Sequence, residues 1–184
     1  MDQILMRFST KIITLLGQLT KSLRDIWKKK FSLILSLLEK LGRKRVIYDR
    51  EDNEPYLIRY YLLFKERRWF PFNIFIHKFL KSDPSELHDH PWPFISVMLK
   101  GGYFEWTYEY DDEGNELPPK REWISAPNIR FARANRFHRI ELMEGVDAWT
   151  LFIPGPQIKQ WGFKVKGKWI ENSKYLGLKK RGKL

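Results

Sequence analysis

The most restrictive feature of this sequence is the stretch from Val46 to Ile170, where short apolar runs follow one another without a long helix. The runs are rich in Tyr, Phe, Ile, Trp and Val, and clusters of Pro, Gly and Asp separate them. Aromatic and β-branched residues favour strands, whereas Gly, Pro and Asp favour turns. We predict strands at residues 45–49, 56–64, 72–80, 94–100, 102–110, 121–124, 136–142, 146–153 and 160–165. Such a succession is typical of an all-β sandwich or closed barrel.

The first 41 residues have the pattern of a helix, or of two consecutive helices. Apolar residues recur there every three or four positions, as expected for one apolar stripe. The stripe consists of Leu5, Phe8, Ile12, Leu15, Leu19, Leu23, Ile26, Phe31, Ile34, Leu35, Leu38 and Leu41. Gly42 provides a stop, because glycine accepts the left-handed conformation that ends helices. The helix is expected either to pack on its own domain or on a second copy through residues 1–41, or to lie on an anionic membrane surface.

The net charge of +12 is concentrated in the two ends of the chain. Residues 1–50 carry 12 Lys and Arg against 4 Asp and Glu, a net charge of +8, and residues 164–184 carry a net +7. Basic ends favour solubility and loose contact with polyanions. No nucleic-acid-binding motif accompanies them, so nucleic acid is not an expected partner. We predict three parts: a helical extension at 1–45, a β-barrel at 46–170 and a basic tail at 171–184, of which residues 174–184 are expected to be loose.

The chain contains no cysteine, which excludes disulfides, thiolate metal sites and cysteine nucleophiles. A metal ion would therefore need nitrogen and oxygen ligands. No signal peptide is apparent, and the longest apolar run, residues 31–38, is far shorter than the ~20 residues that span a bilayer. We expect the protein in the cytoplasm, at a membrane surface if the helix docks there.

The four histidines provide the clearest chemical signal: His77, His88, His90 and His138. His88 and His90 are two residues apart, so on an extended strand both imidazoles point to the same face and can reach one ion. His138 lies in a second predicted strand about fifty residues later. A rolled sheet would bring His138 to the first two. His77 alternates with Phe75 and Phe79 and is expected to be a packed histidine, not a ligand.

The segment from His88 to Gly102 resembles the first motif of the cupin superfamily. In that motif an HxH pair is followed by three or four residues, a glutamate, six more residues and a glycine. Gly101 stands at the glycine position, but Phe94 stands where the glutamate would be. The resemblance implies a cupin double-stranded β-helix, a jelly-roll-like barrel, behind the N-terminal helical extension.

The second cupin motif is degenerate in this chain. The family has a glycine three residues before a single histidine, and here Asn135 precedes His138 at that distance. Arg133 and Leu142 replace the motif's proline and asparagine. Residues 55–165 also resemble small, poorly characterised cupin-like proteins of bacteria and phages; the N-terminal helices lie outside this resemblance.

The missing glutamate implies a site of three histidines, similar to the cysteine dioxygenase branch, in which three histidines hold iron(II). Without a carboxylate ligand the ion keeps more positive charge, which favours direct binding of an anionic substrate. The first hypothesis is therefore an iron(II)-dependent dioxygenase acting on a small anionic molecule. A site of three histidines also accepts zinc, manganese or nickel, and with zinc or manganese an isomerase or hydrolase is expected. The third hypothesis is a non-enzymatic ligand-binding or scaffold barrel that docks through its helices.

Four further residues are candidates for the site. Arg136 lies two residues before His138, and either holds a substrate anion or pairs with a nearby acid. Arg59 interrupts an apolar strand and is a second candidate for substrate binding, with exposure at a sheet edge as the simpler explanation. Tyr103 and Glu105 share one strand face and are catalytic candidates if that face is inward. The apolar alternation instead favours Phe104 and Trp106 as the inward pair.

Overall fold

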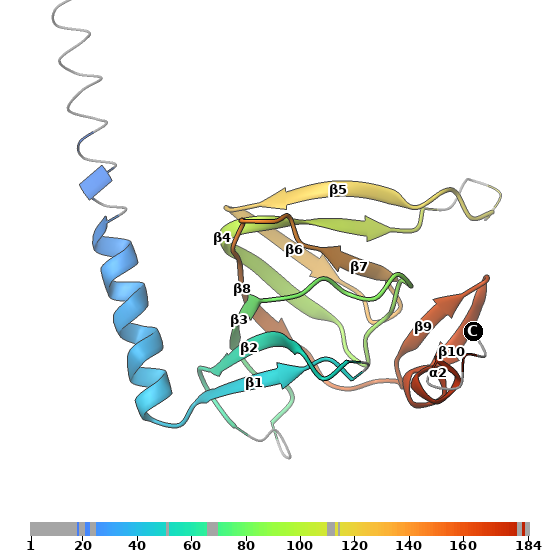
Figure 1. Cartoon of the computed structure of the whole chain (residues 1–184), viewed down its shortest axis with the longest axis horizontal. Coiled ribbons are helices and arrows are strands. Elements are labelled where there is room, and N and C mark those ends of the chain that lie inside the picture. The colour runs from blue at the N-terminus through green and yellow to red at the C-terminus, as the bar shows by residue number, and fades with distance from the viewer. Residues whose placement is uncertain are drawn as a thin grey trace, which may run out of the picture. The chain divides into compact units, whose positions relative to one another are not determined.

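The computed structural model describes residues 18, 21–22, 25–50, 52–65, 70–109, 113, 115–179 and 182. The chain divides into two compact units, Met1–Gly42 and Arg43–Leu184. The expected class, mainly β with a helical N-terminal segment, is confirmed (Figure 1).

In the first unit the described helix covers residues 25–40 and ends at Gly42. Gly42 has a φ of 63° and its N–H donates to the carbonyl of Glu39 at 2.9 Å, which is the predicted glycine stop. The part of the apolar stripe before residue 25 lies outside the described residues, apart from isolated positions. In the part of the chain that is described, no helix is long and apolar enough to cross a membrane.

The described residues of the second unit form ten strands and one short helix. The strands are β1 (Lys44–Tyr48), β2 (Pro55–Tyr61), β3 (Phe75–Phe79), β4 (Phe94–Thr107), β5 (Lys120–Ser125), β6 (Asn128–Ala132), β7 (His138–Glu141), β8 (Ala148–Pro154), β9 (Gly162–Val165) and β10 (Lys168–Glu171), and the helix is α2 (Asn172–Lys179). All pairings are antiparallel, in the order β1-β2-β3-β8-β4-β5. Strands β6 and β7 also pair with β4, while β9 and β10 form a hairpin.

Strand β4 belongs to both sides of the barrel. Its first half pairs with β6 and β8, and its second half pairs with β5 and β7. The change occurs at Gly101, whose φ is +68° and where a Cβ would overlap the carbonyl oxygen of Asp147. Only glycine fits that close approach. In Figure 1, β4 and β5 consequently form one side of the barrel, and β1 and β2 lie on the other.

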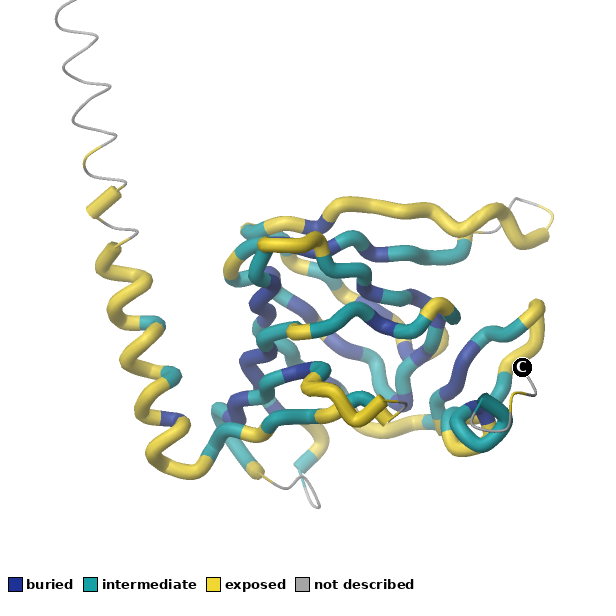
Figure 2. Tube along the Cα trace, in the orientation of Figure 1, coloured by how far each residue is buried: buried dark blue, intermediate teal, exposed yellow. Residues whose placement is uncertain are grey.

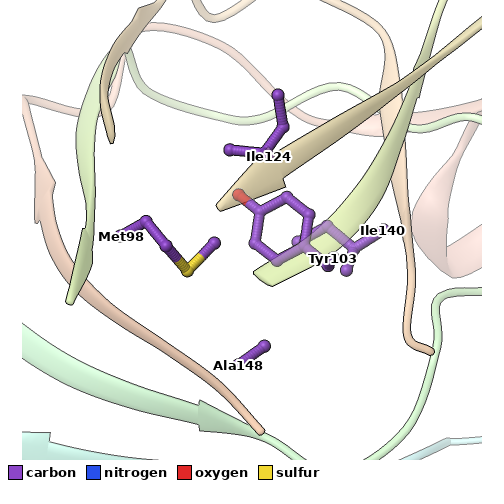
Figure 3. Close-up of a cluster of buried hydrophobic side chains, with 5 residues drawn as sticks. All are labelled: Met98, Tyr103, Ile124, Ile140 and Ala148. Atoms are coloured by element: carbon purple, nitrogen blue, oxygen red, sulfur yellow. The ribbon is translucent and has the colours of Figure 1, made fainter. Parts of the chain in front are cut away.

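The core cluster holds the two sides together. It consists of Met98, Tyr103, Ile124, Ile140 and Ala148, contributed by β4, β5, β7 and β8. Figure 3 shows these side chains turned toward a common space. Burial of each large apolar side chain contributes roughly 1.5–3 kcal/mol. Figure 2 shows the contrast with β5, which is almost wholly exposed apart from Ile124.

Three sequence-based expectations are corrected by the structure. The predicted strands 94–100 and 102–110 form the single strand β4, because the chain bends at Gly101 without breaking. Strand β6 was not predicted; its apolar Ile129 and Phe131 are exposed, so its alternation is inverted. The tail expected to be loose instead contains α2, where fully buried Tyr175 stacks on Phe163 at 4.0 Å and donates to Glu86.

Candidate metal centre

The His88–His90 segment is held between β7 and β9 by backbone hydrogen bonds. His88 and His138 exchange both N–H···O bonds at 2.9 Å, so they lie directly opposite each other. The N–H of Asp89 donates to Gly162, and the N–H of His90 donates to Ala134. The segment is extended but is not part of a regular strand, which differs from the expectation. Its insertion between two strands nevertheless places both imidazoles on one face.

The three imidazoles predicted as ligands converge on one point. Their ring centroids are 5.1 Å apart for His88–His90, 5.1 Å for His88–His138 and 5.0 Å for His90–His138. One ligand atom from each lies within 4.8 Å of the other two. Within the described residues, no other group of three potential ligands is this compact. The histidines remote in sequence do come together, as a cupin-type barrel requires.

His138 is oriented by a buried carboxylate. Its Nδ1 lies 2.7 Å from Oε1 of Glu105, which can only accept when ionised, so Nδ1 carries the proton and the lone pair of the ring is on Nε2. That Nε2 lies 2.7 Å from Nε2 of His90. Carboxylates commonly fix metal-binding histidines in this way. The Nε2 atoms of His90 and His138 therefore point toward the same space on which the three rings converge.

Glu105 is buried, and two arginines compensate its charge. Nη2 of Arg130 lies 2.7 Å from Oε2, and Nη2 of Arg136 lies 3.1 Å from the same oxygen. Burial alone would raise the pKa of Glu105, but the hydrogen bond with His138 and the two guanidinium charges lower it below its ordinary value. Glu105 therefore remains an ionised acceptor at neutral pH. It supports the ligand from behind and is not itself one of the converging donors.

His88 lacks an equivalent hydrogen bond. Its Nδ1 is buried without a hydrogen-bond partner, and the nearest carboxylate oxygen, Oδ2 of Asp83, is 4.0 Å away. Asp83 accepts from the hydroxyl of Tyr56 and, at 2.6 Å, from the N–H of Ile140. Metal-binding histidines usually donate their second ring N–H to a carboxylate or carbonyl. Asp83 could accept such a bond from Nδ1 of His88 when the other ring nitrogen binds an ion.

His88 and His90 stay neutral at neutral pH, as ligands must. Burial lowers the pKa of His88 to about 4, and burial together with the neighbouring His138 and His88 lowers the pKa of His90 well below its usual value. Phe94, at the motif's acid position, packs its ring 4.8 Å from His90 and 5.9 Å from His138. Three neutral nitrogens without a carboxylate fit a divalent transition metal or zinc.

The triad opens into a cavity of about 420 Å³ inside the barrel. Arg59, His77 and Tyr103 line this cavity as well. Arg59 is not simply exposed at a sheet edge: its Nε donates to Nε2 of His77 at 3.0 Å and its guanidinium lies 4.5 Å above the ring of Phe75. His77 is buried between Phe75 and Phe152, as expected for a packed histidine.

The structure decides between the alternatives left open for Tyr103, Glu105 and Arg136. Tyr103 and Glu105 form the buried pair of their strand, so the alternation that favoured Phe104 and Trp106 as the inward pair was misleading. Arg136 precedes β7 in a turn and pairs with Glu105 without lining the cavity. The simpler of its two interpretations, pairing with a nearby acid, is the observed one.

Sequence reasoning missed Asp83 and Arg45. Asp83 lies in a Ser-Asp-Pro turn that reads as a surface loop, and nothing local indicates its burial beside His88. Arg45 lies among the basic residues after Gly42 and was read as part of a helix stop. It lines the cavity directly opposite Arg59. Strand pairing, invisible in the sequence, is the missing signal for both.

No protein-family model and no curated protein matches the chain. Solved structures similar to it include hydroxypropylphosphonic acid epoxidase from S. wedmorenis, with 14% identity, a TM-score of 0.44, and coverage of 61% of this chain and 56% of that one. The polyketide cyclase RemF from Streptomyces resistomycificus has 14% identity and a TM-score of 0.46 over 62% and 75% of the two chains. A cupin-like protein from Thermotoga maritima has 14% identity and a TM-score of 0.39 over 62% and 76%. The match spans little more than half of the epoxidase. These similarities concern the backbone fold and give no information about the chemistry of this chain.

Proposed function

We propose that the barrel binds one divalent metal ion, iron(II), on His88, His90 and His138 and uses dioxygen to oxidise a small anionic substrate. The observation that carries this proposal is the convergence of three imidazoles, without a carboxylate ligand, on an internal cavity. Three protein ligands leave coordination positions open for a substrate and dioxygen. An iron(II) ion would supply the redox chemistry, which none of the protein's own side chains offers.

The charges around the triad support an anionic substrate. Neutral ligands leave the full charge of the ion in place, and Glu105, the nearest buried carboxylate, is already compensated by Arg130 and Arg136. The cavity thus combines an uncompensated cation at the triad with the guanidinium of Arg59. Electrostatic attraction in such an enclosed site is stronger than in water.

Tyr103 is the candidate for a catalytic hydrogen-bond donor. Its ring belongs to the core cluster and the residue lines the cavity. Burial, and the neighbouring charge of Glu105, raise the pKa of the phenol, so it stays protonated. A neutral phenol can donate to an oxygen atom that gains negative charge during the reaction. Glu105 takes the role of a positioning residue for His138.

Metal binding is tested with a matched pair of histidine variants. The purified chain is loaded anaerobically with iron(II) and its metal content is measured. We expect about one ion per chain, lost in His138→Ala and retained in His77→Ala, because both residues line the cavity but only His138 belongs to the triad. Equal retention by the two variants would remove the metal site from the proposal.

The oxygen chemistry is tested in two further steps. Nitric oxide, a stand-in for dioxygen, should give a paramagnetic iron–nitrosyl signal in the loaded wild type, because a coordination position is open. Oxygen uptake is then followed with candidate small acids and thiols. A chain purified with zinc or manganese, and inert toward dioxygen when loaded with iron(II), would favour the isomerase or hydrolase alternative.

A specific observation also supports the alternative of a docking role for the N-terminal helix. Ile26, Trp27, Leu33 and Leu37 are 49%, 53%, 70% and 55% exposed. Co-sedimentation with anionic liposomes is expected to fall in a Leu33→Ser/Leu37→Ser variant if the helix lies on a membrane, and self-association, measured by analytical ultracentrifugation, is expected to fall if it pairs with a second copy. Unchanged behaviour in both measurements would remove this role.

A further inference from the structure

A row of polar side chains crosses the sheet at the β1–β3 side of the cavity. Arg45 of β1 lies directly opposite Arg59 of β2, and Arg59 lies directly opposite His77 of β3. Residues in these positions have Cβ atoms about 4.5–5.5 Å apart. All three line the cavity that holds the triad. Two arginines and one histidine therefore form one cross-strand row, which runs from the exposed Arg45 through the half-buried Arg59 to the buried His77.

The two arginines have no carboxylate between them. Arg59 contacts His77 and the ring of Phe75, and in the described part of the chain no ion pair joins Arg45 or Arg59 to an acid. Like charges directly opposite on paired strands are destabilising. Asp83, the acid that lines the same cavity, is already bound to Tyr56 and the backbone of Ile140. The row thus retains two positive charges that an external anion could neutralise.

The same arginines also line a depression on the outside of the barrel. Arg45 and Arg59 lie there with Lys65, and among the described residues that line the depression there is no Asp or Glu. An entrance with charges of one sign attracts ligands of the opposite sign and raises their local concentration. An anion arriving from solvent would therefore meet the two arginines before it reaches the interior.

An aromatic wall connects the arginine row to the triad. The ring of His77 lies 5.1 Å from that of Phe152, Phe152 lies 4.9 Å from Phe94, and Phe94 lies 4.8 Å from His90. One cavity therefore offers cations at one place, an apolar surface next to them and the candidate metal ligands beyond it. A ligand that fills the cavity would need an anionic group, an apolar middle and a metal-binding end in that order.

We propose that Arg45 and Arg59 bind a doubly charged, phosphate-type oxyanion group of the substrate, a phosphate monoester or a phosphonate. Two guanidinium groups match a dianion in charge, and each can donate two parallel hydrogen bonds to its oxygens. A single carboxylate would leave one cation uncompensated. The apolar middle of the substrate lies along Phe94 and Phe152. The inference rests on the proposed function for the reacting end of the substrate, but not for the binding of the anion.

The test is a calorimetric titration of inorganic phosphate into the full-length chain after removal of metal, at about pH 8, where phosphate groups are dianionic. Acetate at equal ionic strength serves as the monoanion. We expect phosphate to bind at least about tenfold more tightly than acetate, Arg59→Gln to lose at least about tenfold in phosphate affinity, and Arg45→Gln to lose a few-fold, because hydrogen bonds to charged groups contribute about 1.5–3 kcal/mol.

The matched control is Arg121→Gln. Arg121 also stacks on an aromatic ring, Phe104 at 3.4 Å, but it pairs with Glu141 and does not line the cavity. Phosphate affinity unchanged in Arg59→Gln, reduced equally in Arg121→Gln, or no higher than that of acetate would overturn the inference. If Arg59→Gln does not fold, Arg59→Lys is used instead. Lysine keeps the positive charge but cannot donate two parallel hydrogen bonds, so this variant should still lose part of the phosphate affinity. Since metal is absent, failure of the iron chemistry would not affect these results.

Discussion

The charged side chains at the two sides of the cavity differ in whether other charges compensate them. At the triad, Glu105 contacts His138 and is itself bound by Arg130 and Arg136, so each charge has a partner. At the β1–β3 side, Arg45 and Arg59 face each other with no acid between them. Buried charges are costly unless they are paired. The difference indicates that the triad is organised before any ligand arrives, whereas the arginine row is organised to receive one.

The largest effect is expected from removal of the negative charge behind His138. Glu105→Gln should weaken metal binding about 10–100-fold, because a supporting carboxylate fixes the ring and makes its free nitrogen more basic. Competition titration with a chromogenic chelator measures this change. Glu122→Gln is the control, since Glu122 contacts Arg130 at 3.6 Å from an exposed position. Equal affinities in the two variants would show that the triad is not supported as described.

A smaller effect is expected at His88, whose carboxylate is farther away. Asp83→Asn should lower metal affinity by up to about tenfold, because Asp83 at 4.0 Å must shift before it can accept from Nδ1. The same chelator competition measures it. A loss larger than that of Glu105→Gln would reverse the ranking of the two supports. The variant's melting temperature is recorded as well, since Asp83 also accepts from Tyr56 and Ile140.

Arg59, which forms no ion pair with an acid among the described residues, should reduce the stability of the empty barrel. Arg59→Met is expected to raise the melting temperature without ligand by about 2–4 °C, the equivalent of roughly 1 kcal/mol in a chain of this size. Arg130→Met should lower it, because Glu105 then loses one of its two arginines. Differential scanning calorimetry of the two variants tests both signs. Destabilisation by both substitutions would mean that Arg59 is as well compensated as Arg130.

The buried histidines make stability depend on pH. Burial lowers the pKa of His77 well below the ordinary histidine value of 6.5 and lowers the pKa of His88 to about 4, so between those values the unfolded chain binds more protons than the folded one. Their contribution is complete above about pH 6.5 and is lost as the pH falls through the folded values. Thermal unfolding of the metal-free chain should therefore show lower melting temperatures at pH 5 than at pH 7.5.

The variant His77→Gln assigns part of this dependence to the arginine row. It should flatten the decrease between pH 7.5 and pH 5, since one buried group that resists protonation is removed. A melting temperature that is constant over this range in the wild type, or a decrease unaltered in His77→Gln, would contradict the assignment.

Residue spacing was sufficient to predict some features and misleading for others. The HxH pair and the later His138 predicted the triad, because alternation along an extended chain fixes which side chains share a face. The sequence predicted two separate strands on either side of Gly101, whereas the structure has one strand that changes its partners there. The same alternation gave the wrong face for Phe104 and Trp106, since apolar side chains also lie on the outside of a barrel. Strand β6 was missed for this reason.

The sequence by itself determined a mainly β chain with a helical N-terminal segment, and three histidines able to share an ion, because these follow from local periodicity. Only the tertiary structure decided which charges are neighbours: Glu105 behind His138, Asp83 beside His88 and Arg45 opposite Arg59. Those contacts depend on which strands pair and in what register. Register is set by the packing of the whole barrel, so no stretch of sequence contains it.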